Sequence, residues 1–280
     1  MAINLVTKFS PLVDEKFTAE SKTSIVTNKD YDFIGTHSIK IYSVGTAPMN
    51  DYGRNVTDAE DGTMKSRYGA VNDLSTDIQE VSMEKDRSFT FAIDKMDEDE
   101  TLGALNAGSA LARQLREVII PEVDKYTYGK MSAGAGKTTT ETITAESAYL
   151  SILAGTETFD EKMIPIDGRV ITCTPAFYTL LKQDKNAVLE TEIGQNMRIK
   201  GVVSNMDGVT IQKVPSSFLP EKTNFILSHK VATTQAIKLA EYKINNDPQG
   251  ISGSLVEGRI YYTAFVRNNK KNALYVSVHE

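Results

Sequence analysis

A polar, glycine-rich stretch between residues 45 and 80 limits the fold of this chain more than any other feature. It separates IKIYSV (39–44) from RSFTFAID (87–94), and in both segments apolar and polar residues alternate as in a half-buried strand. Compact domains rarely contain a loop of about forty residues unless that loop has a function. We therefore predict a long projecting hairpin, with these two segments as its strands and its packing partners on another molecule.

A long amphipathic helix is predicted to begin near DEDE (97–100), with Asp97 as its N-cap and Glu100 three residues later. Pro121 is expected to kink this helix or to end its first section, and EVDKYTYGKM can continue it for two more turns. Its apolar stripe consists of Ala104, Ala107, Gly108, Leu111, Leu115, Val118 and Ile119. Its polar face consists of Asn106, Ser109, Arg113, Arg116 and Glu117. A helix with one apolar and one charged face is the expected backbone of the molecule.

Residues 146–240 have the pattern of a compact α/β region. The predicted helices are ESAYLSILAGTETFD, AFYTLLKQ and a stretch near 187–198, and the predicted strands are 169–174, GVTIQKV, NFILSH and AIKL. NNDPQG (245–250) is a strong turn signal. The segments SLVEGRIYYTAFV and ALYVSV follow it. We predict that these two form an antiparallel pair that packs on the long helix.

Composition excludes several classes of function. The net charge of the 280 residues is −6, from 31 Lys and Arg against 37 Asp and Glu, whereas proteins that grip nucleic acid through phosphates are usually basic. Sequence-specific DNA binding is therefore not expected, although an acidic wall can enclose DNA without adhering to it. The single cysteine, Cys173, lies in an apolar strand-like run and is expected to be a buried thiol rather than a nucleophile. Neither a signal peptide nor a membrane-spanning run of about 18 apolar residues is apparent, so we expect a soluble protein made in a cytoplasm.

The segment MSAGAGKTTTETI (131–143) contains GAGKT, which resembles the end of a nucleotide-binding loop. Such a loop requires a glycine where Met131 stands, a buried strand before it and a helix after it. The preceding residues are helix-like, and the β-branched run that follows is a poor start for a helix. We therefore expect a helix that ends here, with glycines that allow the chain to reverse, and we keep an NTPase only as the enzyme alternative.

Other catalytic patterns also fail. In ISGSLVEG, Ser254 occupies the place of the last glycine of a nucleophile elbow, and SMEK (82–85) lacks the partner motifs of an S-x-x-K enzyme. The histidines His37, His229 and His279 do not have metal-ligand spacing. We expect no catalytic residue, no cofactor and no metal site.

The order of these parts resembles the major capsid proteins of tailed bacteriophages, which have the Hong Kong 97-type fold. Particular stretches are also similar to capsid proteins of phages that infect Gram-positive bacteria. They are KIYSVGTAPMNDYGR, DRSFTFAIDKMD, VIIPEVDKY, TPAFYTLLK, VPSSFLP and LVEGRIYYTAFVRNNKKNALYV. The resemblance covers nearly the whole chain.

The resemblance implies an α+β fold with five regions. They are an N-terminal arm (1–36), an extended loop with its base strands (37–96), the spine helix of a peripheral domain with its connection (97–142), an α/β axial domain (143–240), and a return to the peripheral domain (241–280). The last strand would be able to rejoin the axial sheet.

The resemblance also implies a function. Copies of the chain would assemble into hexamers and pentamers of an icosahedral shell around double-stranded phage DNA, first in the bacterial host cytoplasm and finally in the virion. A scaffolding protein, a portal and decoration proteins are the other expected partners, and no membrane is expected. The expected inter-subunit contacts are Tyr52, Arg54, Arg67, Tyr68, Arg113 and Arg116. The alternative is an encapsulin-like bacterial compartment that encloses an enzyme.

Some shells of this type are cross-linked by a bond between lysine and asparagine. Lys65 and Asn245 or Asn246 are the candidates here, but no catalytic glutamate can be aligned, so we expect no cross-link. The long N-terminal scaffolding segment of the family is not seen before the first strand. We therefore expect a separate scaffold or a leader that is removed.

Overall fold

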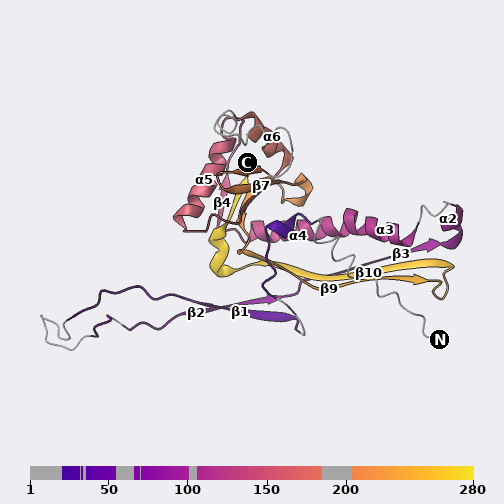
Figure 1. The fold of residues 1–280 in the computed structure, drawn as a ribbon, viewed down its shortest axis with the longest axis horizontal. Coiled ribbons are helices and arrows are strands. Elements are labelled where there is room, and N and C mark those ends of the chain that lie inside the picture. The colour runs from indigo at the N-terminus through magenta and orange to yellow at the C-terminus, as the bar shows by residue number, and fades with distance from the viewer. Residues whose placement is uncertain are drawn as a thin grey trace. The chain divides into compact units, whose positions relative to one another are not determined.

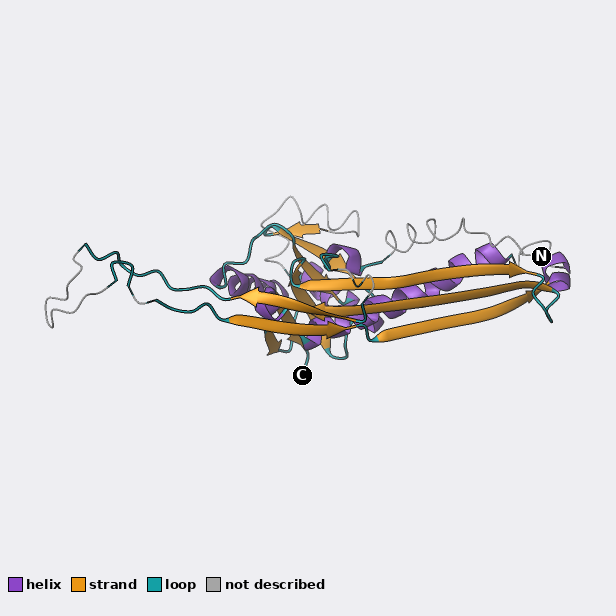
Figure 2. Ribbon diagram, turned by 90° about the horizontal axis from the view of Figure 1, so that it is seen from below, coloured by secondary structure: helices purple, strands orange, loops and turns teal. Residues whose placement is uncertain are grey.

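The computed structural model describes residues 21–31, 33, 36–54, 66–69, 71–100, 106–184 and 204–280. The chain divides into two units (Figures 1 and 2). The larger unit consists of Met1–His37 and Ser82–Glu280, and the smaller unit is Ser38–Val81. The predicted helix near 187–198 and residues Lys65 and Ala104 lie outside the described residues. None of the helices that are described is both long enough and apolar enough to cross a lipid bilayer.

The smaller unit is a hairpin of β1 (Ser38–Val44) and β2 (Thr76–Ser82). Beyond the strands, the segments that follow β1 and precede β2 continue to pair in the same register. The Gly45 amide donates to the Ser75 carbonyl (2.8 Å), and the Gly53 amide donates to the Arg67 carbonyl (2.9 Å). The prediction that residues 87–94 form the second strand of this hairpin is wrong. The sequence TDIQEVS of β2 alternates less clearly than that segment, and so its pairing was missed.

The larger unit contains a three-stranded antiparallel sheet in the order β3-β10-β9. Its strands are β3 (Lys85–Asp94), β9 (Thr233–Asn246) and β10 (Gly253–Val266). The predicted turn in NNDPQG is confirmed: it joins β9 to β10, and the Asp247 amide donates to the Gly253 carbonyl (2.7 Å). Strand β3 joins this sheet because its alternating apolar residues Phe89, Phe91 and Ile93 pack against the long helix.

The long helix runs continuously from Ala107 to Ala133. It consists of α3 (Ala107–Gln114), the π-helical segment η2 (Leu115–Ile119) and α4 (Ile120–Ala133). Pro121 does not end it. The wider π-turn lies directly before this proline, whose ring would otherwise press on the carbonyl four residues earlier.

The expected start of this helix needs correction. Asp97 is not an N-cap, because it lies inside the short helix α2 (Lys95–Glu100). The cap of α3 is Asn106, whose side chain accepts a hydrogen bond from the Gly108 amide (2.9 Å). Val118 is also not part of the buried stripe, because it lies within the π-helical segment and its side chain is exposed.

The long helix packs on the three-stranded sheet, and the two share one core. Its buried residues are Ile93, Ala107, Leu111, Leu115, Ile119, Ile120, Val123, Tyr242, Val256, Ile260 and Tyr262. The C-terminal part of α4 enters a second core through Tyr128 and Met131. One helix therefore links two packed layers of the larger unit.

The second sheet has six strands in the order β4-β11-β8-β5-β7-β6. They are β4 (Lys137–Thr140), β5 (Arg169–Cys173), β6 (Ser204–Met206), β7 (Val209–Lys213), β8 (Thr223–His229) and β11 (Leu274–Val278). Helices α5 (Ala148–Glu161) and α6 (Pro175–Gln183) cover one face, where Phe225 and Leu227 of β8 point. Ile226 points to the opposite face, toward Tyr128 and Met131 of α4.

The last strand corrects another prediction. β11 does not pair with β10; it lies between β4 and β8 of the six-stranded sheet. The 3₁₀ segment η4 (Asn268–Ala273) between them carries the chain from one sheet to the other instead of forming a tight turn. The remaining short 3₁₀ segments are η1 (Thr23–Ile25) and η3 (Ser216–Phe218).

Candidate assembly surfaces

The GAGKT segment connects a helix to a strand at a point where it passes close to another part of the chain. Helix α4 ends at Ala133, and Lys137 opens strand β4 rather than a helix. The Gly136 amide donates to the Lys271 carbonyl (2.9 Å), and a Cβ at Gly136 would lie 2.5 Å from that oxygen. The Lys137 ammonium donates to the Thr158 hydroxyl (3.0 Å). Glycine is required here because two segments approach closely, and the amide that would face a phosphate is already bonded.

This geometry predicts that substitutions at two neighbouring residues affect stability to different extents. Gly136→Ala is expected to lower the free energy of unfolding by about 1–3 kcal/mol, because the Lys271 backbone must move. Lys137→Ala is expected to change it by less than about 1 kcal/mol, because one surface hydrogen bond is lost. Urea denaturation of both variants measures the difference. Loss of an ATP hydrolysis activity in Lys137→Ala would contradict this account.

The other reactive side chains have structural partners. Burial raises the pKa of the Cys173 thiol to about 12, so this group stays protonated and inert at neutral pH, as its apolar context predicted. His37 Nδ1 lies 2.8 Å from the Tyr261 hydroxyl, and His229 Nε2 lies 2.9 Å from the Asp167 carbonyl. Within the described residues, His, Cys, Asp and Glu do not gather into a set that could hold a metal ion.

Four of the six predicted contact residues come together in the smaller unit. The rings of Tyr52 and Tyr68 meet edge to face, with their centroids 5.2 Å apart. Arg54 follows Gly53, which bonds to the carbonyl of Arg67, and both arginines are exposed. Aromatic and arginine side chains are the types that most often dominate protein interfaces.

The smaller unit also carries an unusual share of exposed apolar surface. Within the described residues, eight of the fifteen large exposed apolar side chains belong to it: Tyr42, Val44, Met49, Tyr52, Tyr68, Val71, Leu74 and Ile78. An isolated two-stranded hairpin is marginally stable at best, and exposed apolar surface of this kind marks interaction sites. The hairpin therefore has the properties of a segment that packs on another chain.

The remaining two predicted contact residues lie on the long helix in the larger unit. Arg113 pairs with Glu117 one turn later (3.0 Å), and Arg116 is exposed beside them. Because the Arg113–Glu117 pair is exposed to solvent, it stabilises the helix only slightly. Its charges remain available to a neighbouring surface.

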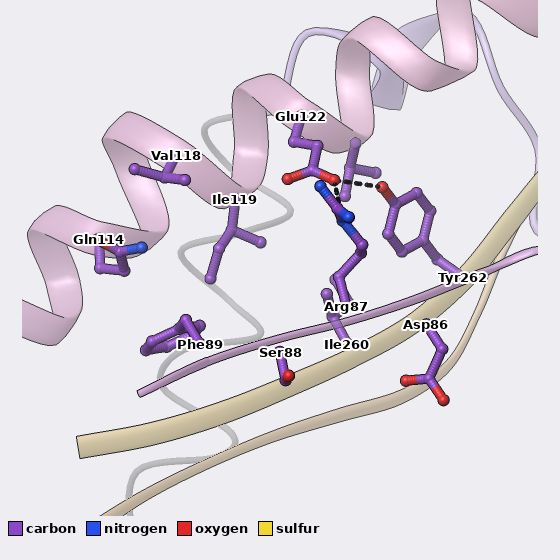
Figure 3. Close-up of a pocket in the computed structure, with 11 residues that line it drawn as sticks. Asp86, Arg87, Ser88, Phe89, Gln114, Val118, Ile119, Glu122, Ile260 and Tyr262 are labelled. Carbon is purple, nitrogen blue, oxygen red and sulfur yellow. Dashed lines mark hydrogen bonds and ion pairs between the residues drawn. The ribbon is translucent and has the colours of Figure 1, made fainter. Parts of the chain in front are cut away.

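A groove lies between β3 and the long helix (Figure 3). Its cavity volume is about 340 Å³, and apolar walls are formed by Phe89, Val118, Ile119 and Ile260. At one end the Arg87 guanidinium contacts the Glu122 carboxylate (2.7 Å), and the Tyr262 hydroxyl lies 3.4 Å from the same carboxylate.

The polar groups of this groove are suited to packing rather than catalysis. Burial, reinforced by the Glu122 charge, raises the pKa of Tyr262, so its hydroxyl stays protonated. Arg87 is paired with Glu122, and Asp86 is paired with Arg259 (2.6 Å). The sequence did not indicate this groove, since its walls come from segments far apart in the chain.

A second ion pair ties the segment that follows β2 to the long helix. Lys130 contacts Glu84 at 2.7 Å, and the Tyr126 hydroxyl donates to Glu84 (2.9 Å). The hydrogen bond from Lys130 holds the pKa of Glu84 below its ordinary value. With Arg87–Glu122, this pair fastens residues 84–87, at the return from the hairpin, to α4.

A buried carboxylate holds the base of the N-terminal segment. Asp124 of α4 accepts hydrogen bonds from the Ser21 hydroxyl (2.6 Å), the Lys22 amide (2.8 Å) and the Thr23 hydroxyl (2.8 Å). The Tyr128 hydroxyl donates to the Lys22 carbonyl (3.1 Å). Burial raises the pKa of the Asp124 carboxyl, and the three hydrogen bonds oppose this shift. We call this group the Asp124 clasp.

Asn28 forms a second attachment a few residues later. Its amide group donates to the carbonyls of Lys230 and Val231 (3.0 and 3.1 Å), and its side-chain oxygen accepts from the Thr234 hydroxyl (2.6 Å). Its backbone forms a parallel bridge with Thr234. Residues 21–28 are therefore fixed to both α4 and β9, which no local pattern in the sequence predicts.

The long helix on a three-stranded sheet, the six-stranded α/β unit and the separate hairpin together define the Hong Kong 97-type fold of tailed-phage capsids. A solved structure from Mycobacterium phage Che8 is 16% identical, with a TM-score of 0.70 over 90% of this chain and 88% of the other. The capsid of cyanophage P-SCSP1u is 12% identical, with a TM-score of 0.71 over 100% and 90%. A virus-like particle from Pyrococcus furiosus is 9% identical, with a TM-score of 0.59 over 96% and 97%.

The family model described as phage capsid protein matches residues 78–276, and the chain belongs to this family. It is a major capsid protein, a structural and non-enzymatic subunit of the virion shell. Curated protein sequences include no match to it.

Proposed function

We propose that this capsid protein assembles into hexamers and pentamers of an icosahedral shell that encloses double-stranded DNA. One observation carries the proposal: the 38–81 hairpin exposes most of the large apolar side chains that the described residues expose. On a shell, each hairpin is covered by a neighbouring copy, and many such contacts together close a stable particle.

The regions have corresponding roles in this proposal. Residues 1–36 are the N-terminal arm, 37–96 the extended loop and its base strands, 97–142 the spine and its connection, 143–240 the axial domain and 241–280 the return to the peripheral domain. Within these regions, β3 and β9 belong to the sheet under the spine, and β4 and β11 belong to the axial sheet. The extended loop reaches over a neighbouring copy through Tyr52, Arg54, Arg67 and Tyr68. Arg113 and Arg116 contact another copy from the spine. The clustering of the first four residues and the exposure of all six support this assignment.

Other partners follow from composition and resemblance. The net charge of −6 keeps the enclosed DNA from adhering to the inner wall of the shell. The shell therefore encloses DNA without binding a specific DNA sequence. A scaffolding protein, a portal and decoration proteins complete the particle, which assembles in the host cytoplasm. The similarity of stretches such as KIYSVGTAPMNDYGR supports a phage of Gram-positive bacteria as the source.

Negative-stain microscopy of the purified chain, alone and with the scaffolding protein of its phage, tests the proposal. Closed particles of uniform size are the expected result. Small monodisperse particles under every condition would contradict it. The match to a virus-like particle from Pyrococcus furiosus motivates a second measurement, mass spectrometry of the particle contents. DNA is expected, and a co-purified enzyme would instead support a compartment of the encapsulin type.

A further inference from the structure

The turn that ends helix α5 contains an unusual residue. The Met163 amide donates to the Asp160 carbonyl (2.8 Å) and the Ile164 amide donates to the Phe159 carbonyl (3.0 Å), which is the hydrogen-bond pattern of a Schellman motif. In that motif the position of Met163 adopts a left-handed conformation and is usually glycine. Met163 has a φ of 52°, and so its backbone is strained by its side chain.

Met163 is also 90% exposed. The other non-glycine residues with positive φ in the described part of the chain are Asp207, Lys222 and Asp247, all of them polar. Met163 therefore combines a strained backbone with an exposed large apolar side chain. The Schellman hydrogen bonds require the left-handed backbone at this position, but they do not require a large apolar side chain there.

The exposed apolar surface continues beyond this residue. Pro165 is exposed, and Ile166 is 59% exposed. Ile164, between Met163 and Pro165, turns inward and packs against the core under α5. We call residues 163–166 the Met163 loop. It exposes three apolar residues, and two backbone hydrogen bonds join its first turn to the end of α5.

The charges around the Met163 loop indicate the kind of partner. Glu161 and Asp167 flank it against one basic residue, Lys162, and the nearby Arg169 is bound to Asp160 (2.7 Å). An acidic border disfavours both DNA and anionic lipid, which basic side chains attract. An apolar protein surface is the partner that remains. In a shell subunit, the surface that is present around every copy is that of another copy.

We infer that the Met163 loop is a contact between copies of this chain, with Met163 inserted into an apolar surface of the neighbouring subunit. The inference rests on the proposed shell function and adds a specific contact to it. Met163 is the most exposed of the loop's large apolar side chains, and assembly compensates for the strain that glycine would avoid.

Two variants separate the fold from assembly. Met163→Gly relieves the backbone strain and removes the apolar contact, whereas Lys222→Gly relieves the same kind of strain (φ 63°) at an exposed polar position. Neither variant is expected to lower the melting temperature of the unassembled chain. The yield of closed particles at a fixed protein concentration is expected to fall about tenfold or more for Met163→Gly and to stay within about twofold of wild type for Lys222→Gly.

Ile166→Ser is a second variant of the loop, and its particle yield is expected to fall as well. Wild-type yield for both Met163→Gly and Ile166→Ser would overturn the inference while leaving the shell function intact. A defect of Met163→Gly that appears only when a scaffolding protein is present would also overturn it, because the occupant would then be that protein. If the wild-type chain itself forms no particles, the proposed function fails, and the inference fails with it.

Discussion

Replacing Asp124 by alanine is expected to lower the free energy of unfolding by about 2–4 kcal/mol. The substitution leaves three donors, the hydroxyls of Ser21 and Thr23 and the Lys22 amide, without their shared acceptor. The substitution also removes the free-energy cost of burying the Asp124 carboxyl group, which offsets part of the loss in stability. Guanidinium denaturation followed by circular dichroism measures the change, and proteolysis near Ser21 is expected to become faster.

Glu117→Ala is the matched control on the same helix. Its carboxylate pairs with Arg113 at the surface, so its loss is expected to cost less than about 0.5 kcal/mol. Equal stability of the Asp124→Ala and Glu117→Ala variants would show that the Asp124 clasp does not hold the N-terminal segment.

The Asp124 clasp also has an expected pH dependence. Burial raises the pKa of Asp124 in the folded chain above its value in the unfolded chain, so the folded state binds this proton more tightly. The stabilisation from the proton is complete below the unfolded pKa and is lost as the pH rises through the folded pKa. The stability of wild type relative to Asp124→Asn is therefore expected to be greatest on the acid side of that interval.

The second large effect concerns the hairpin. Replacing both Tyr52 and Tyr68 by alanine is expected to abolish particle formation at concentrations where wild type assembles. Buried aromatic side chains at the centre of an interface typically contribute about 2 kcal/mol or more each. Both rings lie outside the buried clusters of the larger unit, so the melting temperature of the unassembled chain is expected to stay unchanged.

The conservative pair of Tyr52→Phe and Tyr68→Phe keeps both rings, and its particles are expected to form almost normally. If the double alanine variant forms particles of wild-type size and yield, these tyrosines are not part of the interface between subunits. A fall in melting temperature instead would mean that the rings stabilise their own chain.

The elements with strong local patterns were predictable from the sequence. Helix α6 begins at Pro175 behind its Thr174 cap, β5 has a run of β-branched residues at its centre, and the turn after β9 contains proline and glycine at suitable places. Each of these elements can be recognised from residues that are neighbours in the sequence.

The pairing of distant strands cannot be recognised in this way, because the sequence patterns of β2 and β3 are both compatible with pairing to β1. The packing of Phe89, Phe91 and Ile93 on the long helix places β3 in the three-stranded sheet instead.

The polar composition between residues 45 and 80, with its few tyrosines and arginines, led to the prediction of contact residues there. The structure places Tyr52 and Tyr68 side by side in this region, and their part in an interface stays a prediction. The Asp124 clasp carries no such signal, since Ser21 lies 103 residues away in the chain. Met163 is visible in the sequence as an ordinary methionine, and only its positive φ and its exposure distinguish it.

Cryo-electron microscopy of assembled particles tests the central claim most directly. The map is expected to show the ribbon from Ser38 to Val81 of each subunit lying on a different subunit, with Tyr52 and Tyr68 covered by that neighbour. The contrary result would be a chain that stays monomeric under all assembly conditions, with the same ribbon packed against its own larger unit.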